Sequence, residues 1–328
     1  MRRREFIAGL GSAAVAMPFA AWAQQGERVP RIGVLMPFDE NDPEGKLRYS
    51  AFTQVLAGLG WTDGRNVRID YRWSAGDPER NTKYVAELVT VAPDAILATG
   101  LPILEPLMRA TRTVPIVFVQ VADPVGAGVV ESLARPGGNA TGFTNVEYSM
   151  SGKWVELLKA IAPRVRRAAV LRETGPGGIA MFAAIQTVAS SLSVVVRPIG
   201  VSNLGEIERM VAAFAREPNG ALIVTPSGLS IVQREPIVAL AARHRLPAIY
   251  GLRAFISAGG LISYGADSIE PYRGAAGYID RILKGETPGD LPVQAPNKFE
   301  LVINLKTAKA LGLTIPETLL ATADEVIQ

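Results

Sequence analysis

The sequence predicts an α/β protein made of two similar lobes, each a doubly wound, Rossmann-like parallel sheet with helices on its faces. Short β-branched runs alternate with amphipathic stretches of helical period, and this alternation occurs twice, before and after the turn-rich segment 135–142. Several of the runs, such as 95–97 and 116–119, are continuously apolar. Continuous apolar runs are typical of parallel strands that are buried on both faces.

The first lobe follows a βαβαβαβ order. We expect its strands at residues 31–36, 67–71, 95–98 and 115–119. Between them, the spacing of apolar residues predicts helices at residues 46–59, 79–91 and 103–111. An alternation of this kind indicates a parallel sheet whose helices are the crossover connections.

The second lobe repeats this order and is followed by a shorter tail. Its expected helices are 152–161, 179–192, 204–216 and 232–244, and its expected strands are 168–171, 194–196, 221–224 and 247–250. Beyond them we expect a strand at 260–264, a helix at 269–283, a strand at 299–304 and a final helix. This surplus suggests that the chain returns to the first lobe and then to the second. The predicted lobes are therefore 29–141 with 252–288, and 142–251 with 289–328, joined by a hinge of three crossovers.

The first 23 residues have the organisation of an export signal. A basic cluster at 2–4 precedes an apolar run at 7–21, and Ala21-Trp22-Ala23 provides the small-x-small pattern of a signal-peptidase site. The pair Arg3-Arg4 resembles a twin-arginine signal. An uncleaved anchor is the alternative, but the run is shorter than the roughly 20 residues of a membrane span. We expect cleavage after Ala23 and a periplasmic protein.

Charge and composition exclude several classes of function. The signal carries three Arg and one Glu, so its removal lowers the net charge from +3 to +1. A protein with nearly balanced charge has no basic footprint for nucleic acid. The chain contains no cysteine, so no disulfide framework stabilises it in an oxidising compartment.

The chain also lacks the residue constellations of an enzyme. Its only histidine, His244, lies at a predicted helix end, and there is no cysteine, so a Cys/His nucleophile pair is impossible. Neither a Gly-x-Ser-x-Gly elbow nor a Walker-type loop is present. We therefore predict no enzyme activity, no metal site and no cofactor.

Three long segments carry specific motifs: 60–67 (GWTDGRNV), 114–145 (including VADPVGAGVVESLARPGGNATGFTN) and 259–313 (including YRGAAGYIDRILKGETPGDLPVQAPNKFE). Together they resemble the ABC transporter substrate-binding family that includes tryptophan- and tyrosine-binding lipoproteins. The resemblance covers nearly all of the chain after the signal. It implies the type I periplasmic binding protein fold and an exported solute receptor that delivers its ligand to an inner-membrane ABC permease.

Two positions depart from that family's pattern. Ala122 stands before Asp123-Pro124 where a Ser is usual, and the loop after the third strand is Gly100-Leu101-Pro102 rather than Gly-Thr/Ser-Pro. Both changes remove a hydroxyl group. They suggest a more apolar pocket than that of the amino-acid-binding relatives.

The ends of the first lobe's strands carry candidate ligand contacts. Thr99, Gly100 and Leu101 end a strand and open a helix, which offers backbone N–H groups to a carboxylate, or is a plain strand-to-helix turn. Asp123 and Pro124 follow the fourth strand, where the carboxylate either accepts from a ligand ammonium or hydroxyl, or caps the next turn. Phe38 either covers a planar ligand or packs under its loop.

The second lobe and the crossovers carry the remaining candidates. Thr225, Pro226 and Ser227 follow a strand and offer hydroxyl groups. Near the predicted crossovers we expect contacts from Thr144, Tyr250, Arg253 and Tyr264, each of which is alternatively a hinge residue.

Two strand edges that face one cleft indicate a ligand clamp. We predict a monomeric periplasmic solute-binding protein of an ABC importer, which closes its lobes over an amino acid or an aromatic or branched carboxylate. The alternatives are a periplasmic sensor that presents ligand occupancy to a membrane signalling protein and, more remotely, a periplasmic hydrolase.

Overall fold

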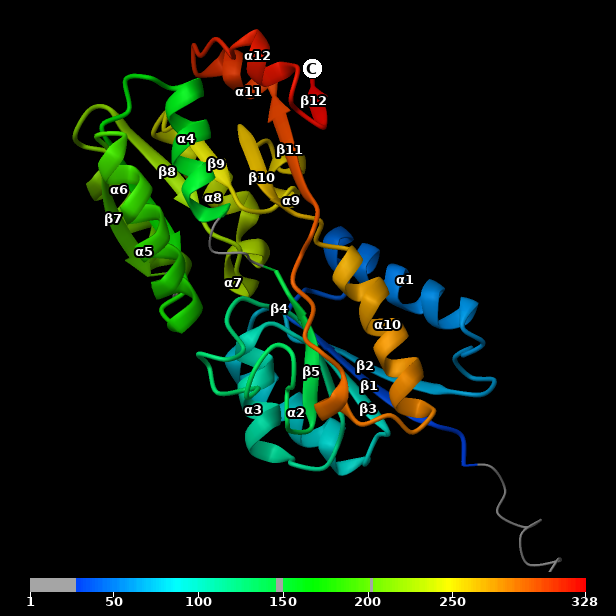
Figure 1. The fold of residues 1–328 in the computed structure, drawn as a ribbon. Coiled ribbons are helices and arrows are strands. Elements are labelled where there is room, and N and C mark those ends of the chain that lie inside the picture. The colour runs from blue at the N-terminus through cyan, green and yellow to red at the C-terminus, as the bar shows by residue number, and fades with distance from the viewer. Residues whose placement is uncertain (1–27, 146–149, 201–202) are drawn as a thin grey trace, which may run out of the picture.

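The computed structural model describes residues 28–145, 150–200 and 203–328. Two mainly parallel sheets, each covered by helices, form two lobes that are joined by extended segments (Figure 1). This arrangement confirms the predicted α/β class. The predicted signal at 1–23 lies outside the described residues.

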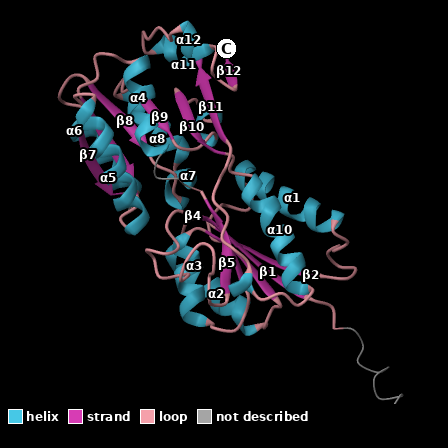
Figure 2. Ribbon diagram, in the orientation of Figure 1, coloured by secondary structure: helices cyan, strands magenta, loops and turns pink. Residues whose placement is uncertain are grey.

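The sheet of the first lobe has five parallel strands in the order β2-β1-β3-β4-β5. The strands are β1 (Arg31–Met36), β2 (Arg68–Trp73), β3 (Ala95–Thr99), β4 (Ile116–Val121) and β5 (Ala140–Thr144). One face is covered by α1 (Pro43–Gly58) and α10 (Glu270–Leu283), and the other by α2 (Pro78–Thr90) and α3 (Leu101–Ala110) (Figure 2).

The fifth strand of this sheet, β5, was not predicted. Its first residues belong to the turn-rich segment 135–142, and Gly142 stands in the middle of the strand. A Cβ at Gly142 would lie 1.9 Å from the carbonyl oxygen of Phe118 on β4, so only glycine fits. Gly142 is thus required because two backbones approach closely, although a glycine in this context is also typical of a turn.

The sheet of the second lobe has seven strands in the order β12-β11-β10-β9-β8-β6-β7. All neighbours are parallel except β10 and β11. The strands are β6 (Arg167–Arg172), β7 (Val195–Gly200), β8 (Gly220–Val224), β9 (Ala248–Tyr250), β10 (Ile262–Ala266), β11 (Phe299–Asn304) and β12 (Glu325–Ile327). The short last strand was not predicted.

The helices of the second lobe follow the predicted order with one break. They are α4 (Ser151–Ile161), α5 (Pro176–Ser191), α6 (Leu204–Phe214), α7 (Gly228–Val232), α8 (Arg234–Arg243), α9 (Ala254–Ser257), α11 (Leu305–Ala310) and α12 (Glu317–Leu320). The single helix expected at 232–244 is preceded by the separate short helix α7, because Ser227 and Ser230 form a capping box five residues earlier.

The predicted lobe boundaries need two corrections. Strand β10 pairs with β9 and β11, so residues 252–266 belong to the second sheet and not to the first lobe. Likewise β5 extends the first sheet to Thr144, beyond the expected boundary at 141. The part that returns to the first lobe is α10 with the short 3-10 helix Pro288–Asp290. The chain still crosses between the sheets three times: between β5 and α4, between β10 and α10, and between the 3-10 helix and β11.

Helix α1 begins three residues earlier than predicted because Asp42 caps it. The side chain of Asp42 accepts from the backbone N–H of Glu44 at 2.8 Å, and Pro43 occupies the first helical turn, where no N–H is needed. Asp77 caps α2 in the same way. The cap fixes Asp42 at the edge of the first lobe that faces the second.

The apolar core is continuous between the lobes. One cluster of buried residues includes Phe38 and Val119 of the first lobe as well as Leu171, Ile231 and Leu252 of the second. The two lobes are therefore packed against each other, and the molecule has a closed arrangement.

Candidate functional site

The predicted site residues lie mainly where the strands of each sheet end opposite the other lobe (Figure 1). In the first lobe, the loops after β1, β3 and β4 carry Phe38, Thr99–Leu101 and Asp123–Pro124. In the second lobe, Thr225–Ser227 follow β8, and Tyr250 ends β9. Carboxyl ends of parallel strands are the usual place for a ligand in α/β sheets.

Glycines at the start of α5 bring the second lobe against the first. A Cβ on Gly177 would lie 2.8 Å from the Cβ of Ala122 and 3.5 Å from the backbone nitrogen of Asp123. A Cβ on Gly175 would lie 3.9 Å from Cδ2 of Leu101. The missing side chain at Gly177 therefore allows α5 to approach the loop after β4. Two of the predicted site positions, Leu101 and Asp123, lie at this contact.

Asp123 acts as a cap in the structure. Its Oδ1 accepts a 2.7 Å hydrogen bond from the backbone N–H of Gly126, which fixes the turn that begins at Pro124. This is the second of the two roles expected for Asp123. The other carboxylate oxygen leaves capacity for a further hydrogen bond, because an ionised carboxylate has about four acceptor sites.

The loop after β3 is held by the sheet and by α10. Gly100 has a φ of 80°, which glycine adopts without strain, and its N–H donates to the carbonyl of Val119 at 2.9 Å. The N–H of Gly100, one of the donors that this turn was expected to offer to a carboxylate, is therefore used within the sheet. The Oγ1 of buried Thr99 accepts from the hydroxyl of Tyr272 at 3.1 Å. Burial raises the pKa of Tyr272 to about 12, so it remains a donor.

Phe38 packs under its own loop. Its side chain is 1% exposed, and a Cβ on Gly45 would come within 2.7 Å of it. The guanidinium of Arg48 lies 5.2 Å from the centre of the ring, within the range of a cation–π contact. Phe38 is thus a core residue in the closed arrangement, which corresponds to the second expected alternative.

The hydroxyl groups of the second lobe bind the local backbone. Thr225 donates to the carbonyl of Leu171 at 3.0 Å, and Ser227 Oγ accepts from the N–H of Ser230 at 2.9 Å. Thr225 is completely buried. Pro226 packs against Gly251, where a Cβ would lie 2.4 Å from the proline ring. These contacts shape the edge of the second lobe.

Tyr250, Arg253 and Tyr264 do not converge on one point. Tyr250 is buried and stacks on Phe255 at 4.7 Å, and burial raises its pKa. Arg253 forms ion pairs with Glu300 and Glu325 in its own lobe. The backbone carbonyl of Tyr264 accepts from the indole of Trp154 at 2.6 Å. Each of these residues therefore makes these contacts within the second lobe.

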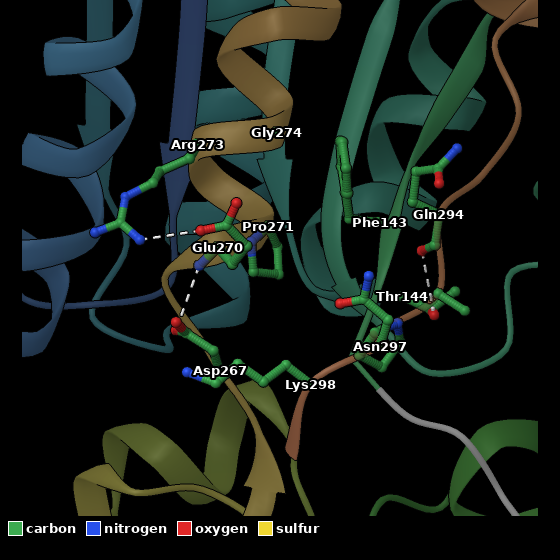
Figure 3. Close-up of a pocket in the computed structure, with 12 residues that line it drawn as sticks. Phe143, Thr144, Asp267, Glu270, Pro271, Arg273, Gly274, Gln294, Asn297 and Lys298 are labelled. Atoms are coloured by element: carbon green, nitrogen blue, oxygen red, sulfur yellow. Dashed lines mark hydrogen bonds and ion pairs between the residues drawn. The ribbon is translucent and has the colours of Figure 1, made fainter. Parts of the chain in front are cut away.

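Thr144 lies at the hinge. Its N–H donates to the carbonyl of Gln294 at 2.9 Å, which ties the first crossover to the third. A pocket of about 500 Å³ opens there between the crossover segments (Figure 3). Three of its charged groups are in ion pairs, since Glu270 contacts Arg273 at 3.0 Å and Lys298 contacts Glu300 at 3.2 Å. The carboxylate of Asp267 accepts from the backbone N–H of Ile269 at 2.7 Å. The pocket is lined by Phe143, Thr144, Asp267, Glu270, Pro271, Arg273, Gly274, Gln294, Ala295, Pro296, Asn297 and Lys298.

The second crossover is held at Ser268 by two side chains of the first lobe. Arg48, which is fully buried, donates to Ser268 Oγ at 2.8 Å. Gln120 donates to the carbonyl of Ser268 at 3.3 Å. Gln120 has a φ of 59° at an irregularity in β4, a conformation that costs a non-glycine residue free energy. Local sequence patterns give no indication of this anchor, because both side chains are remote from Ser268 in sequence.

Glu173, which directly follows β6, is a further acidic residue that was not predicted for the site. Burial and the charge of Glu105 on α3 raise its pKa to about 7, while the backbone N–H of Gly228 acts in the opposite direction. Gly175, two residues further on, lies at the contact with Leu101, so Glu173 lies near the opposite lobe. Its position directly after a strand is the signal that could have identified it.

An ion pair joins the two lobes directly. Arg234, at the start of α8, contacts Asp42, the cap of α1, through two hydrogen bonds of 2.8 and 3.0 Å. The partners are 192 residues apart, so local sequence patterns give no indication of this pair. A further interlobe contact lies beside it, since a Cβ on Gly76 would lie 3.5 Å from Val232.

None of the helices within 28–145, 150–200 and 203–328 combines the length and apolar character needed to cross a membrane. In the same ranges, no three His, Asp or Glu side chains come together as metal ligands would.

The family model for ABC transporter substrate binding proteins matches residues 32–327. The chain therefore belongs to this family, whose members bind small-molecule ligands, are exported and work with ABC permeases. It is similar to the tyrosine-binding protein of Clostridioides difficile, with 28% identity over 264 residues that cover 80% of this chain and 75% of that protein.

Solved structures support the same family and fold. One is an ABC domain from Streptococcus pneumoniae in complex with L-Trp, with 28% identity, a TM-score of 0.84, and coverage of 92% of this chain and 100% of that one. Another is a conserved domain protein from Vibrio cholerae, with 27% identity, a TM-score of 0.84, and coverage of 91% and 100%. The fold is that of type I periplasmic binding proteins.

Proposed function

We propose that the protein is the periplasmic solute-binding protein of an ABC importer and captures one small organic ligand between its lobes. The observation that carries this proposal is that the carboxyl ends of the parallel strands of both lobes face each other. Three crossovers of the chain form the hinge between these lobes. A ligand that contacts both edges stabilises the closed form and shifts the hinge equilibrium toward it. The closed form is then the state that an inner-membrane permease recognises.

We further propose that the protein reaches the periplasm as a monomer through the twin-arginine route. The basic, apolar and Ala-Trp-Ala succession in residues 1–23 supports export with cleavage after Ala23. The near-balanced charge of the remaining chain gives no reason to expect nucleic acid as a partner.

The proposed ligand is an amino acid or an aromatic or branched carboxylate. Relatives named for tyrosine or solved with L-Trp support the amino acid class. Ala122 and Leu101 line the contact between the lobes and carry no hydroxyl group, which favours an apolar group on the ligand. Asp123 and Glu173 are the acidic groups beside this contact, and either could accept from an ammonium or hydroxyl group.

Two measurements test this function together. Native protein, purified gently and then denatured, should release its ligand for identification by mass spectrometry. Calorimetry should then show one site for that molecule within a panel of L-tryptophan, L-tyrosine, branched amino acids and aromatic acids. A protein that releases no small molecule and binds no member of the panel would contradict the proposed ligand class.

A further inference from the structure

The ion pair between Asp42 and Arg234 connects the lobes at the edge of the cleft. Arg234 NH1 lies 2.8 Å from Asp42 Oδ2, and Arg234 NH2 lies 3.0 Å from Asp42 Oδ1. The side chains are only 10% and 11% exposed. A two-pronged contact between a guanidinium and a carboxylate is among the strongest and most directional hydrogen-bonded pairs in proteins.

Each partner is fixed by its own lobe. Asp42 caps α1 by accepting from the N–H of Glu44, and Arg234 NH1 also donates to the carbonyl of Ile231 at 3.0 Å. Two side chains that are already oriented lose little conformational freedom when they meet. Formation of this pair on lobe closure therefore costs less conformational entropy than the pairing of two flexible surface side chains would.

Removal of water strengthens the contact. Val232 lies two residues before Arg234 and packs toward Gly76 of the first lobe, at 3.5 Å from a Cβ built there. The side chains of Arg234 and Asp42 are 10% and 11% exposed, so little solvent reaches the ion pair. An ion pair that is shielded from water and from salt interacts more strongly than an exposed one.

A second pair in the same molecule shows the contrast. Arg281 and Glu286 also form two hydrogen bonds, through Nε and NH2. Both side chains are 46% exposed, and both belong to the end of α10 and the loop after it. Exposed pairs of this kind contribute little to stability, and this one spans no hinge.

We propose that Asp42 and Arg234 form an interlobe clasp that sets how far the protein is closed before ligand binds. Opening the hinge separates α1 from α8, so the clasp exists only in the closed form. The affinity for any cleft ligand then depends on the clasp, because a ligand that needs the closed form binds in proportion to its population. Asp42 and Arg234 are positioning residues in this account, since they act on the lobes. The effect on affinity rests on the proposed function, whereas the effect on closure does not.

The test is a distance measurement on ligand-free protein. The chain has no cysteine, so spin labels can be placed on Thr82→Cys in α2 and Arg243→Cys in α8, two exposed positions in different lobes. Pulsed electron resonance then compares the otherwise unchanged labelled protein with Arg234→Met and Asp42→Asn. Asparagine keeps the helix cap and removes the charge. Arg281→Met is the matched control.

We expect the short-distance population to fall in Arg234→Met, in Asp42→Asn and, to the same extent, in the double variant. Arg281→Met should leave it unchanged. Identical distance distributions in all five proteins would overturn the clasp. Thermal unfolding of each variant shows whether it is folded, and if Arg234→Met is not, Asp42→Asn alone decides.

Calorimetry with L-tryptophan as the probe separates the two proposals. We expect each single variant to bind about fivefold or more weakly, and the double variant no more weakly than either single variant. Full affinity in variants that have lost the short-distance population would overturn the link between clasp and affinity. If neither the unmodified protein nor any variant binds L-tryptophan but the distances still change, the clasp stands, L-tryptophan is not the ligand, and the panel member that does bind replaces it as the probe.

Discussion

The hydroxyl of Tyr272 on α10 donates a 3.1 Å hydrogen bond to Thr99 Oγ1 at the end of β3. Both side chains are buried, at 0% and 3% exposure. The bond ties the segment that returns from the second lobe to the strand end beside the cleft. It links the stability of the first lobe to the shape of the site.

Tyr272→Phe should lower the free energy of unfolding by about 1 to 2 kcal/mol, because a buried hydroxyl loses its partner. Urea unfolding at constant pH measures this change. The double variant Tyr272→Phe with Thr99→Val should cost less than the sum of the single variants, since it removes both polar groups. Additive costs would show that the two side chains do not depend on each other.

Asp123 has two proposed roles, and two substitutions separate them. Asp123→Asn keeps an oxygen that accepts from the N–H of Gly126 but removes the charge, whereas Asp123→Ala removes both. We expect Asp123→Asn to retain stability and to bind the ligand about tenfold more weakly. Asp123→Ala should also lose about 1 kcal/mol of stability.

Calorimetry with the ligand identified by mass spectrometry, together with urea unfolding, measures both effects. If Asp123→Asn binds that ligand as tightly as the unmodified protein, Asp123 serves only as a cap and the binding role is wrong.

Glu173 should make stability depend on pH. Its pKa is about 7 in the folded protein, above the ordinary 4.5, because burial penalises the charged carboxylate. Between these values the folded state binds more protons than the unfolded state, so stability falls as pH rises. From pH 4 to 8 the protein should lose about 3 kcal/mol that Glu173→Gln does not lose, since each pKa unit corresponds to about 1.4 kcal/mol.

Urea unfolding of both proteins across this range measures the difference. Glu105→Gln is the control: it removes the like charge on α3, so it should lower the pKa of Glu173 and reduce the pH effect. A constant difference between the unmodified protein and Glu173→Gln at every pH would contradict a raised pKa.

Export is tested on the full-length chain. We expect N-terminal sequencing of protein from the periplasm to begin at Gln24. Replacement of Arg3 and Arg4 by Lys should stop export, because the twin-arginine route reads the arginine pair. Export that persists in this variant would indicate the general secretory route, and a stable cytoplasmic form that begins at Met1 would rule out the signal.

Local patterns predicted most of the fold. The apolar runs gave the buried strands of both sheets, and strand β11 has the predicted ends Phe299 and Asn304. Strand β5 was missed because Gly142 and its neighbours have the composition of a turn, while the pairing that makes them a strand involves β4, more than 20 residues earlier. The membership of β10 in the second sheet likewise depends on its partners and not on its own residues.

The site was predicted in position but less well in detail. The rule that ligands lie at strand ends located Asp123 and Leu101, which the structure places at the lobe contact. The same rule cannot tell which side chains bind their own backbone, as Thr225 and Ser227 do. It also cannot pair Asp42 with Arg234, because that contact arises only when two lobes close.

Small-angle X-ray scattering tests the central claim most directly. It compares the protein without ligand and with a saturating amount of the molecule identified by mass spectrometry, after calorimetry has confirmed binding. The ligand is expected to contact both lobes and to draw them together about the hinge. The radius of gyration should therefore fall when it binds. An unchanged radius of gyration, with the site fully occupied and the unliganded protein free of its native ligand, would contradict closure of the lobes over the ligand.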